Sequence, residues 1–218
     1  MSSTAAVSPD RSFHPIKAAA LAVVVLVAFG FVIKYVLHYY FNYNAGAFAD
    51  FWPQPRRSGI LLHISAGTVA LLLGPWQFSR RLRQRHLQWH RVIGRSYLIA
   101  VLLAATGAFL LAFTTRPWAW QFGLFGLALA WVSTSGMAYY AIKRRQIQLH
   151  REWMVRSYVV TFAFVTFRLF DDMGPTSHLM PEMDRALTFI WACWALPLLV
   201  TEVVLQLRRM RHTHAPLR

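Results

Sequence analysis

Two histidines occupy matching places in two similar stretches of the chain. The stretches QWHRVIGRSYLI at 88–99 and QLHREWMVRSYVV at 148–160 share a glutamine, a His-Arg pair and a later Arg-Ser-Tyr. The histidines are His90 and His150, and an apolar run follows each of them. Two imidazoles that face one another from different helices are the ligands that a b-type haem needs. The pattern therefore raises the hypothesis of haem iron held between His90 and His150.

Four arginines accompany this pair, and arginine can pair with haem propionates. The candidates are Arg91, Arg95, Arg151 and Arg156. Arg95 follows its histidine by five residues and Arg156 by six. Because one residue turns a helix by about 100°, these two arginines are equivalent only if the local backbone differs. Alternatively, all four anchor helix ends at lipid head groups, which leaves the repeated histidines unexplained.

Three more ionisable residues fall inside apolar segments, where such groups are costly and often functional. His63, in GILLHISAGTVALLLG, is either a ligand or a neutral side chain that hydrogen-bonds a neighbouring helix. Arg168 precedes Asp171 by three residues and can pair with that acidic end of its segment. Glu202 precedes Arg208 by six residues, near the end of its segment, where water can solvate it. Both Arg168 and Glu202 can instead belong to a proton or substrate path.

Composition indicates a membrane protein. Apolar residues make up 56% of the 218 residues and charged residues 14%, whereas a soluble domain carries about 25% charged residues. The net charge of +15 comes from blocks between apolar runs, which is typical of membrane loops rather than of a nucleic-acid-binding face. The single cysteine, Cys193, excludes an intramolecular disulfide. We expect the lipid bilayer as a partner, no nucleic acid, and no defined oligomeric state from the sequence.

Six segments are long and apolar enough to cross a bilayer as helices, which takes about 20 residues each. They are 18–40, 58–77, 93–113, 119–141, 155–171 and 187–207. The sequence thus predicts an all-α, polytopic membrane bundle with one six-helix domain at 18–207. Residues 1–17 are predicted to be a disordered cytoplasmic N-terminus, and residues 208–218 a basic cytoplasmic tail.

The distribution of basic residues predicts the orientation. Seventeen lysines and arginines between the segments or at their ends fall on one side, and Arg56, Arg57, Arg116 and Arg185 fall on the other. The positive-inside rule therefore predicts that both termini are cytoplasmic.

The second and third segments resemble the fourth and fifth at an offset of about 60 residues, which predicts a duplicated helical hairpin. The duplication places His90 and His150 at the cytoplasmic ends of the third and fifth segments, where they face one another.

Four stretches carry a family resemblance: LLHISAGTVALLLGPWQF, HRVIGRSYL, HREWMVRSYVVTFAFVTFRLF and WACWALPLLVTE. Over residues 58–203 the chain resembles the bacterial integral-membrane family called domain of unknown function 2306. The resemblance implies a multi-pass fold in the bacterial inner membrane and no particular activity.

A more distant, architectural resemblance is to cytochrome b-561 proteins, six-helix electron carriers with one haem ligated from the third and fifth helices. His90 and His150 match that placement. The other haem of that family uses the second and fourth helices; His63 could supply one ligand, but the fourth segment has no histidine.

Two functions remain open. The first is electron transfer through a b-type haem, with a quinone or another redox partner. The second is a non-redox role, as a small transporter or an accessory membrane subunit, in which His63, Arg168 and Glu202 line a polar path or an interface. The sequence does not decide whether the protein is an enzyme, since it carries no phosphate-binding glycine loop, Cys-x-x-Cys-His or HExxH motif.

Overall fold

The computed structural model describes residues 15–41, 53–172 and 180–213, and these residues form helices joined by short connections. The elements are α1 (Pro15–Phe31), the π-helical turn η1 (Val32–Val36), α2 (Leu37–Phe41), α3 (Arg56–Gln77), α4 (Arg80–Arg85), α5 (Leu87–Phe113), α6 (Trp118–Lys143), α7 (Ile147–Thr161), α8 (Ala163–Asp172) and α9 (Glu182–Thr213). The predicted all-α membrane bundle is confirmed. Most of the predicted N-terminal segment and the end of the basic tail lie outside the described residues.

Six membrane spans fit this set of helices. Five are single runs long and apolar enough to cross a membrane, the first of them Ala18–Phe41. The sixth is α7 with α8, a pair bent by 41° at Phe162. Just before the bend, the Thr161 hydroxyl donates to the Ser157 carbonyl at 2.9 Å. Such a bond back to the preceding turn often bends a helix, which accounts for a break without proline or glycine.

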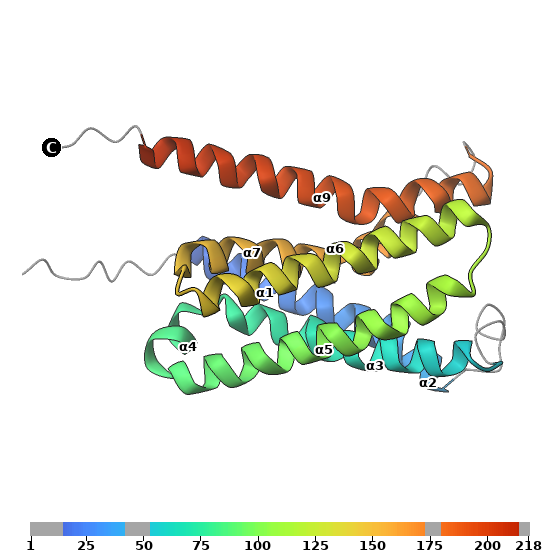
Figure 1. The fold of residues 1–218 in the computed structure, drawn as a ribbon, viewed down its shortest axis with the longest axis horizontal. Coiled ribbons are helices and arrows are strands. Elements are labelled where there is room, and N and C mark those ends of the chain that lie inside the picture. The colour runs from blue at the N-terminus through green and yellow to red at the C-terminus, as the bar shows by residue number, and fades with distance from the viewer. Residues whose placement is uncertain (1–14, 42–52, 173–179, 214–218) are drawn as a thin grey trace, which may run out of the picture.

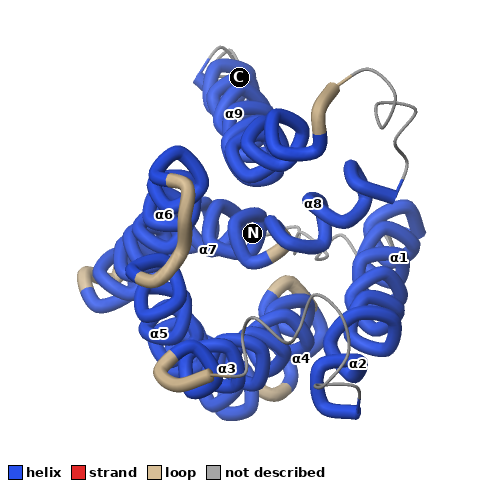
Figure 2. Tube along the Cα trace, turned by 90° about the vertical axis from the view of Figure 1, so that its right-hand side faces the viewer, coloured by secondary structure: helices blue, strands red, loops and turns tan. Residues whose placement is uncertain are grey.

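The helices pack as two hairpins with outer helices around them. Helix α3 packs along α5, α6 packs along α7, and α5 joins the two hairpins by packing on α6. Seen along the helices, α1 and α8 close the side of the bundle opposite α5 and α6, and α9 lies outside, against α6, α7 and α8 (Figure 2). The two predicted hairpins are therefore also the two closely packed helix pairs of the fold.

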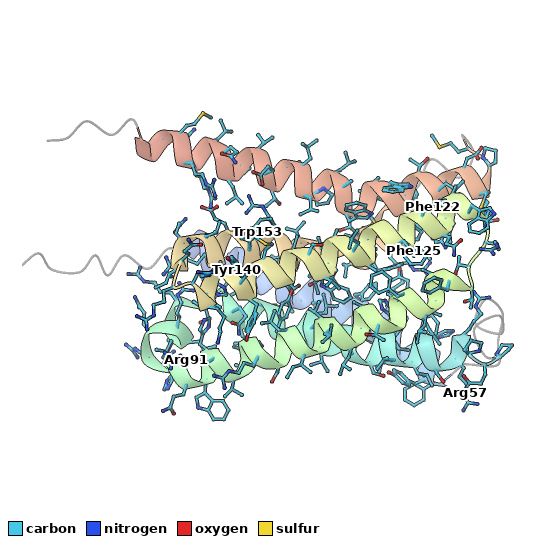
Figure 3. The ribbon with its side chains drawn as sticks, viewed as in Figure 1. Arg57, Arg91, Phe122, Phe125, Tyr140 and Trp153 are labelled. Atoms are coloured by element: carbon cyan, nitrogen blue, oxygen red, sulfur yellow. The ribbon has the colours of Figure 1, made fainter. Side chains whose placement is uncertain are left out.

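The two ends of the bundle differ in chemistry. Helix α4 and the starts of α5 and α7 lie at one end, where α9 also finishes (Figure 1). We call it the histidine end, because His90 and His150 lie in the first turns of α5 and α7. Arg91 marks this end and Arg57 the opposite end (Figure 3).

Helices α3 and α5 approach each other closely at two glycines. A Cβ atom placed on Gly107 of α5 would lie 2.6 Å from the Gly59 carbonyl oxygen and 2.7 Å from the His63 backbone nitrogen. Small residues at membrane helix crossings allow this kind of backbone contact. Gly107 therefore sets the position of the α3 turn that carries His63.

A buried hydroxyl network joins the two hairpins. The Tyr97 hydroxyl of α5 lies 2.7 Å from Ser157 Oγ and 2.8 Å from Thr161 Oγ1, both on α7. Ser135 of α6 lies 2.7 Å from Ser157, and Trp131 Nε1 donates to Thr161 at 2.8 Å. Because the Thr161 proton goes to a backbone carbonyl, Tyr97 donates to Thr161 and Ser157 donates to Tyr97. Each hydroxyl oxygen of this network therefore has a partner inside the bilayer.

Candidate functional site

The structure brings His90 and His150 to the same end of the bundle. Arg83 of α4 and Arg91 of α5 lie at this end as well (Figure 1). The Nδ1 atom of His150 lies 2.8 Å from the Ala138 carbonyl oxygen, so it donates and leaves Nε2 for another partner. The Nδ1 atom of His90 is buried and has no hydrogen bond to any described residue. The two histidines share one end of the bundle, but their Nδ1 atoms have different surroundings.

The four arginines near these histidines have different surroundings. Arg91, Arg95 and Arg151 are exposed, and Arg156 is buried. Arg95 and Arg156 thus occupy different environments, as their unequal spacing from the histidines predicts.

Arg156 is engaged with helix α9. Its Nε lies 3.0 Å from Glu202 Oε2, its Nη2 also bonds Glu202, and its Nη1 lies 4.0 Å from Glu152 Oε2. Glu152 in turn binds Arg209 of α9. Arg156 and Glu202, which the sequence analysis treats separately, are therefore partners in one ion-pair network, and Glu202 meets α7 rather than only water near Arg208.

A cavity of about 380 Å³ lies in the other half of the bundle, with lining from α1, η1, α3, α5, α6, α7 and α8. Its volume falls in the usual range for sites that hold small molecules. Most of the wall is aliphatic or aromatic, for example Ile60, Leu124, Leu127 and Phe164. Both His63 and Arg168 line it, so the cavity joins two residues predicted from different segments.

His63 stands in the wall of this cavity with one nitrogen occupied. Its Nδ1 lies 2.9 Å from the Ala104 carbonyl oxygen, and its ring meets Trp131 and Phe164 edge-on at 6.3 and 6.1 Å between centroids. Because a carbonyl only accepts, Nδ1 is the donor, and Nε2 of the neutral ring is an acceptor. Nε2 has no hydrogen bond to any residue in the described part of the chain. The bond to Ala104 agrees with the predicted alternative in which a neutral His63 hydrogen-bonds a neighbouring helix. Its Nε2 remains available to a ligand.

Among the described residues, three arginines line the same cavity, and no aspartate or glutamate does. They are Arg56 at the start of α3, Arg116 before α6, and Arg168 on α8, all toward the end opposite the histidine end. Arg116 donates to Gln121 at 2.9 Å and lies 4.0 Å from the Trp118 ring centroid. Arg168 Nη1 lies 3.4 Å from Asp171 Oδ2, the acid predicted as its partner. The cavity is thus apolar in its body and carries three arginines on one side, of which Arg168 also pairs with Asp171.

The π-helical turn η1 supplies part of the cavity wall beside α3, on which it packs. It carries Tyr35 and Val36, both of which line the cavity. Tyr35 and Lys34 both bind the Asp172 carboxylate at the end of α8, and the Lys34 Nζ to Oδ2 distance is 2.6 Å. Since π-helical turns are rare and often occur at functional sites, this turn supports the cavity as a candidate functional site.

The cavity was not predicted from the sequence, and neither was the place of Arg56, Arg116, Tyr35, Trp131 and Thr161 in its wall. One sequence feature pointed to two of these residues: Arg56 and Arg116 are among the few basic residues on the predicted outer side. A cation there opposes the positive-inside trend and needs another explanation.

The described residues contain no group of three or more His, Cys, Asp or Glu side chains placed to hold a metal ion.

The family model described as "Predicted membrane protein (DUF2306)" matches residues 60–205, from within α3 to within α9. No curated protein and no solved structure matches the chain.

Proposed function

The chain belongs to the DUF2306 family of predicted membrane proteins, and we propose that it binds an amphiphile with an anionic head group in the cavity between α1, α3, α6 and α8. The observation that carries this proposal is the lining, which in the described part of the chain combines an apolar body with three arginines and no acid. Apolar walls with a few placed polar groups are typical of small-molecule sites. This is the binding step that a small transporter needs.

The arginines select the sign of the head group. Their side chains lie on one side of the cavity, where a carboxylate or phosphate can pair with them. The positive-inside rule assigns the histidine end to the cytoplasm, so the proposed head group lies toward the outer face of the inner membrane.

His63 supplies a second, deeper contact. With Nδ1 donating to Ala104, the neutral ring offers Nε2 to a donor such as a ligand hydroxyl. Its place on α3, two turns below Arg56, separates this acceptor from the arginine by about 10 Å along the helix axis. The favoured ligand therefore has a charged head, an apolar body and a hydroxyl at the far end.

Four probes of similar chain length test the proposal in detergent: dodecanoate, ω-hydroxydodecanoate, dodecanol and dodecyltrimethylammonium. Binding is measured from the quenching or enhancement of tryptophan fluorescence, to which Trp120 and Trp131 of the wall respond. We expect dodecanoate to bind more tightly than dodecanol, and the trimethylammonium probe to bind most weakly. Equal affinity for the anion and the cation would contradict the proposal.

Two variants test the named contacts with the same probes. Arg168→Gln is expected to weaken dodecanoate binding about tenfold, because a charge-assisted hydrogen bond contributes roughly 1.5 kcal/mol or more. Arg57→Gln removes an exposed outer arginine that does not line the cavity, and should change the affinity less than twofold. His63→Phe is expected to remove the preference for ω-hydroxydodecanoate over dodecanoate. A preference that survives in His63→Phe would exclude Nε2 as the acceptor.

A b-type haem between His90 and His150 is the second candidate, with a quinone or another redox partner. It is favoured by the place of both histidines at one end of the bundle and by the His150 Nδ1 bond to Ala138, since a ligating histidine usually donates its other nitrogen. The remaining residues do not fit a haem as well. His90 lacks such a bond among the described residues, and Arg156, a predicted propionate partner, is bound to Glu202.

The haem candidate predicts a coloured protein. Protein purified from haem-replete cells should show a Soret band and a reduced-minus-oxidised α band, both lost in the His90→Ala, His150→Ala double variant. A colourless protein, or an unchanged spectrum in that variant, would rule out this haem site and leave the cavity proposal unaffected.

A further inference from the structure

A group of basic side chains gathers at the histidine end, from three different helices. We call it the basic cluster: Arg80 and Arg83 of α4, His90 and Arg91 of α5, and His150 and Arg151 of α7. Burial and the charges of Arg151 and Arg80 lower the pKa of Arg83. Helix α4 and the starts of α5 and α7 lie at the same end of the bundle (Figure 1), so basic side chains of both hairpins share this end and repel one another in the absence of an anion.

The described acids do not neutralise this cluster. Glu152 and Glu202 are the acidic residues on α7 and on the matching part of α9, and they bind Arg209 and Arg156. None of the ion pairs formed within the described residues includes a member of the cluster. The cluster is thus a concentration of positive charge available to an external anion.

Exposed apolar side chains on the same turns indicate what kind of anion fits. Leu87, Trp89 and Val92 of α5 and Ile147 of α7 are each about half exposed or more. A free inorganic anion gains nothing from these side chains, whereas the acyl chains of a lipid can cover them. Tryptophan also favours the level of lipid head groups, so Trp89 fits the boundary between head group and chain.

We propose that the basic cluster binds the phosphodiester head group of an anionic phospholipid, which bridges the two hairpins through Arg83 and Arg151. Basic pockets between membrane helices are known to take such head groups. The site lies at the opposite end of the bundle from the cavity and does not depend on the proposed function.

The test uses the full chain in maltoside detergent with dioleoyl-phosphatidylglycerol, dioleoyl-phosphatidylcholine or inorganic phosphate. Native mass spectrometry counts retained lipid, and the midpoint of thermal unfolding is followed as each probe is added. We expect phosphatidylglycerol alone to be retained and to raise the midpoint. Arg83→Gln with Arg151→Gln should weaken its binding about twenty-five-fold, since each arginine near the surface contributes roughly fivefold.

Arg95→Gln with Lys143→Gln is the matched control, because it removes two charges near the same end from outside the cluster. This control should bind phosphatidylglycerol within threefold of the unchanged protein.

In lipid-free detergent, the Arg83→Gln, Arg151→Gln protein should unfold at the same or a higher temperature, because the repulsion between its basic side chains is relieved. This outcome also shows that the variant folds. Equal loss of lipid in the two double variants, or equal stabilisation by phosphatidylcholine, would overturn the proposal. An equal effect of inorganic phosphate would replace the lipid with a free anion and overturn it as well.

Discussion

Replacing Gly107 with alanine is expected to destabilise the protein by about 3 kcal/mol or more, the upper range for overpacking a tight interior. The new Cβ would lie 2.6 Å from the Gly59 carbonyl oxygen and 2.7 Å from the His63 backbone nitrogen. Both neighbours are backbone atoms, so no side chain can rotate away, and α3 must separate from α5. Unfolding of the purified protein by dodecyl sulfate measures the loss.

Gly136→Ala is the matched control for this prediction. Gly136 is also inside a spanning helix, α6, and a Cβ there meets nothing within 4 Å. Alanine should be neutral there, or stabilising by up to about 1 kcal/mol, because glycine is the poorer helix former. If the two variants unfold alike, the α3–α5 crossing does not have the contact described here. A folded Gly107→Ala protein should also lose affinity for the cavity probes, because the strain displaces His63.

Replacing Arg156 with leucine is expected to destabilise the protein by about 2 kcal/mol. Removing one partner of a fully buried ion pair costs roughly 3–5 kcal/mol. The Glu202 side chain is 43% exposed and keeps its bond from Gln206, so water compensates part of the loss. The Glu152 side chain is 6% exposed but keeps Arg209 and Gln148. The same dodecyl sulfate titration measures the change.

A double-mutant cycle separates this ion pair from other effects of the substitution. Glu202→Leu combined with Arg156→Leu should be less destabilising than the sum of the two single changes, because the second substitution removes a charge that has already lost its partner. Strict additivity would contradict the pairing of α7 with α9. Arg156→Lys is expected to restore only part of the stability, since lysine has a single donor nitrogen and lacks the planar guanidinium whose Nε and Nη2 both reach Glu202.

The helices were predictable because the lipid bilayer imposes a length and a composition on each span. The predicted segments 58–77 and 119–141 differ little from α3 and α6. The third segment was predicted to start at 93, yet α5 starts at Leu87, because a helix can continue into the basic region beyond the apolar run. The bend at Phe162 was missed, since it depends on the Thr161 hydroxyl and on no proline or glycine.

The candidate site was predictable only in part. Single ionisable residues inside apolar runs identified His63, Arg168 and Glu202, because such residues are costly in lipid. Which of them share a site depends on helix tilt and rotation, which periodicity does not reveal. His63 and Arg168 line one cavity, whereas Glu202 of α9 pairs with Arg156 of α7. The place of Arg116 in the cavity wall was harder still to predict, because Arg116 lies in a connection between helices and reaches the cavity from there.

The cavity, proposed to bind anionic amphiphiles, and the charged histidine end are two separate regions of the bundle. These two regions are joined through α5, which carries Gly107 beside His63 and His90 in its first turn. The buried hydroxyls of Tyr97, Ser157 and Thr161 lie between them and hold the hairpins in a fixed relation.

Photoaffinity labelling tests the central claim most directly. A saturated fatty acid with a diazirine on its chain is irradiated with the protein, and the labelled residues are identified by peptide mass spectrometry. We predict adducts on the walls of the cavity, at α3 near Ile60 and at α6 near Leu127, that disappear when excess dodecanoate is present and persist with excess dodecyltrimethylammonium. Adducts confined to exposed residues of α9, such as Leu199 and Val200, and unaffected by either competitor, would show that the fatty acid meets only the outer surface and would contradict the account.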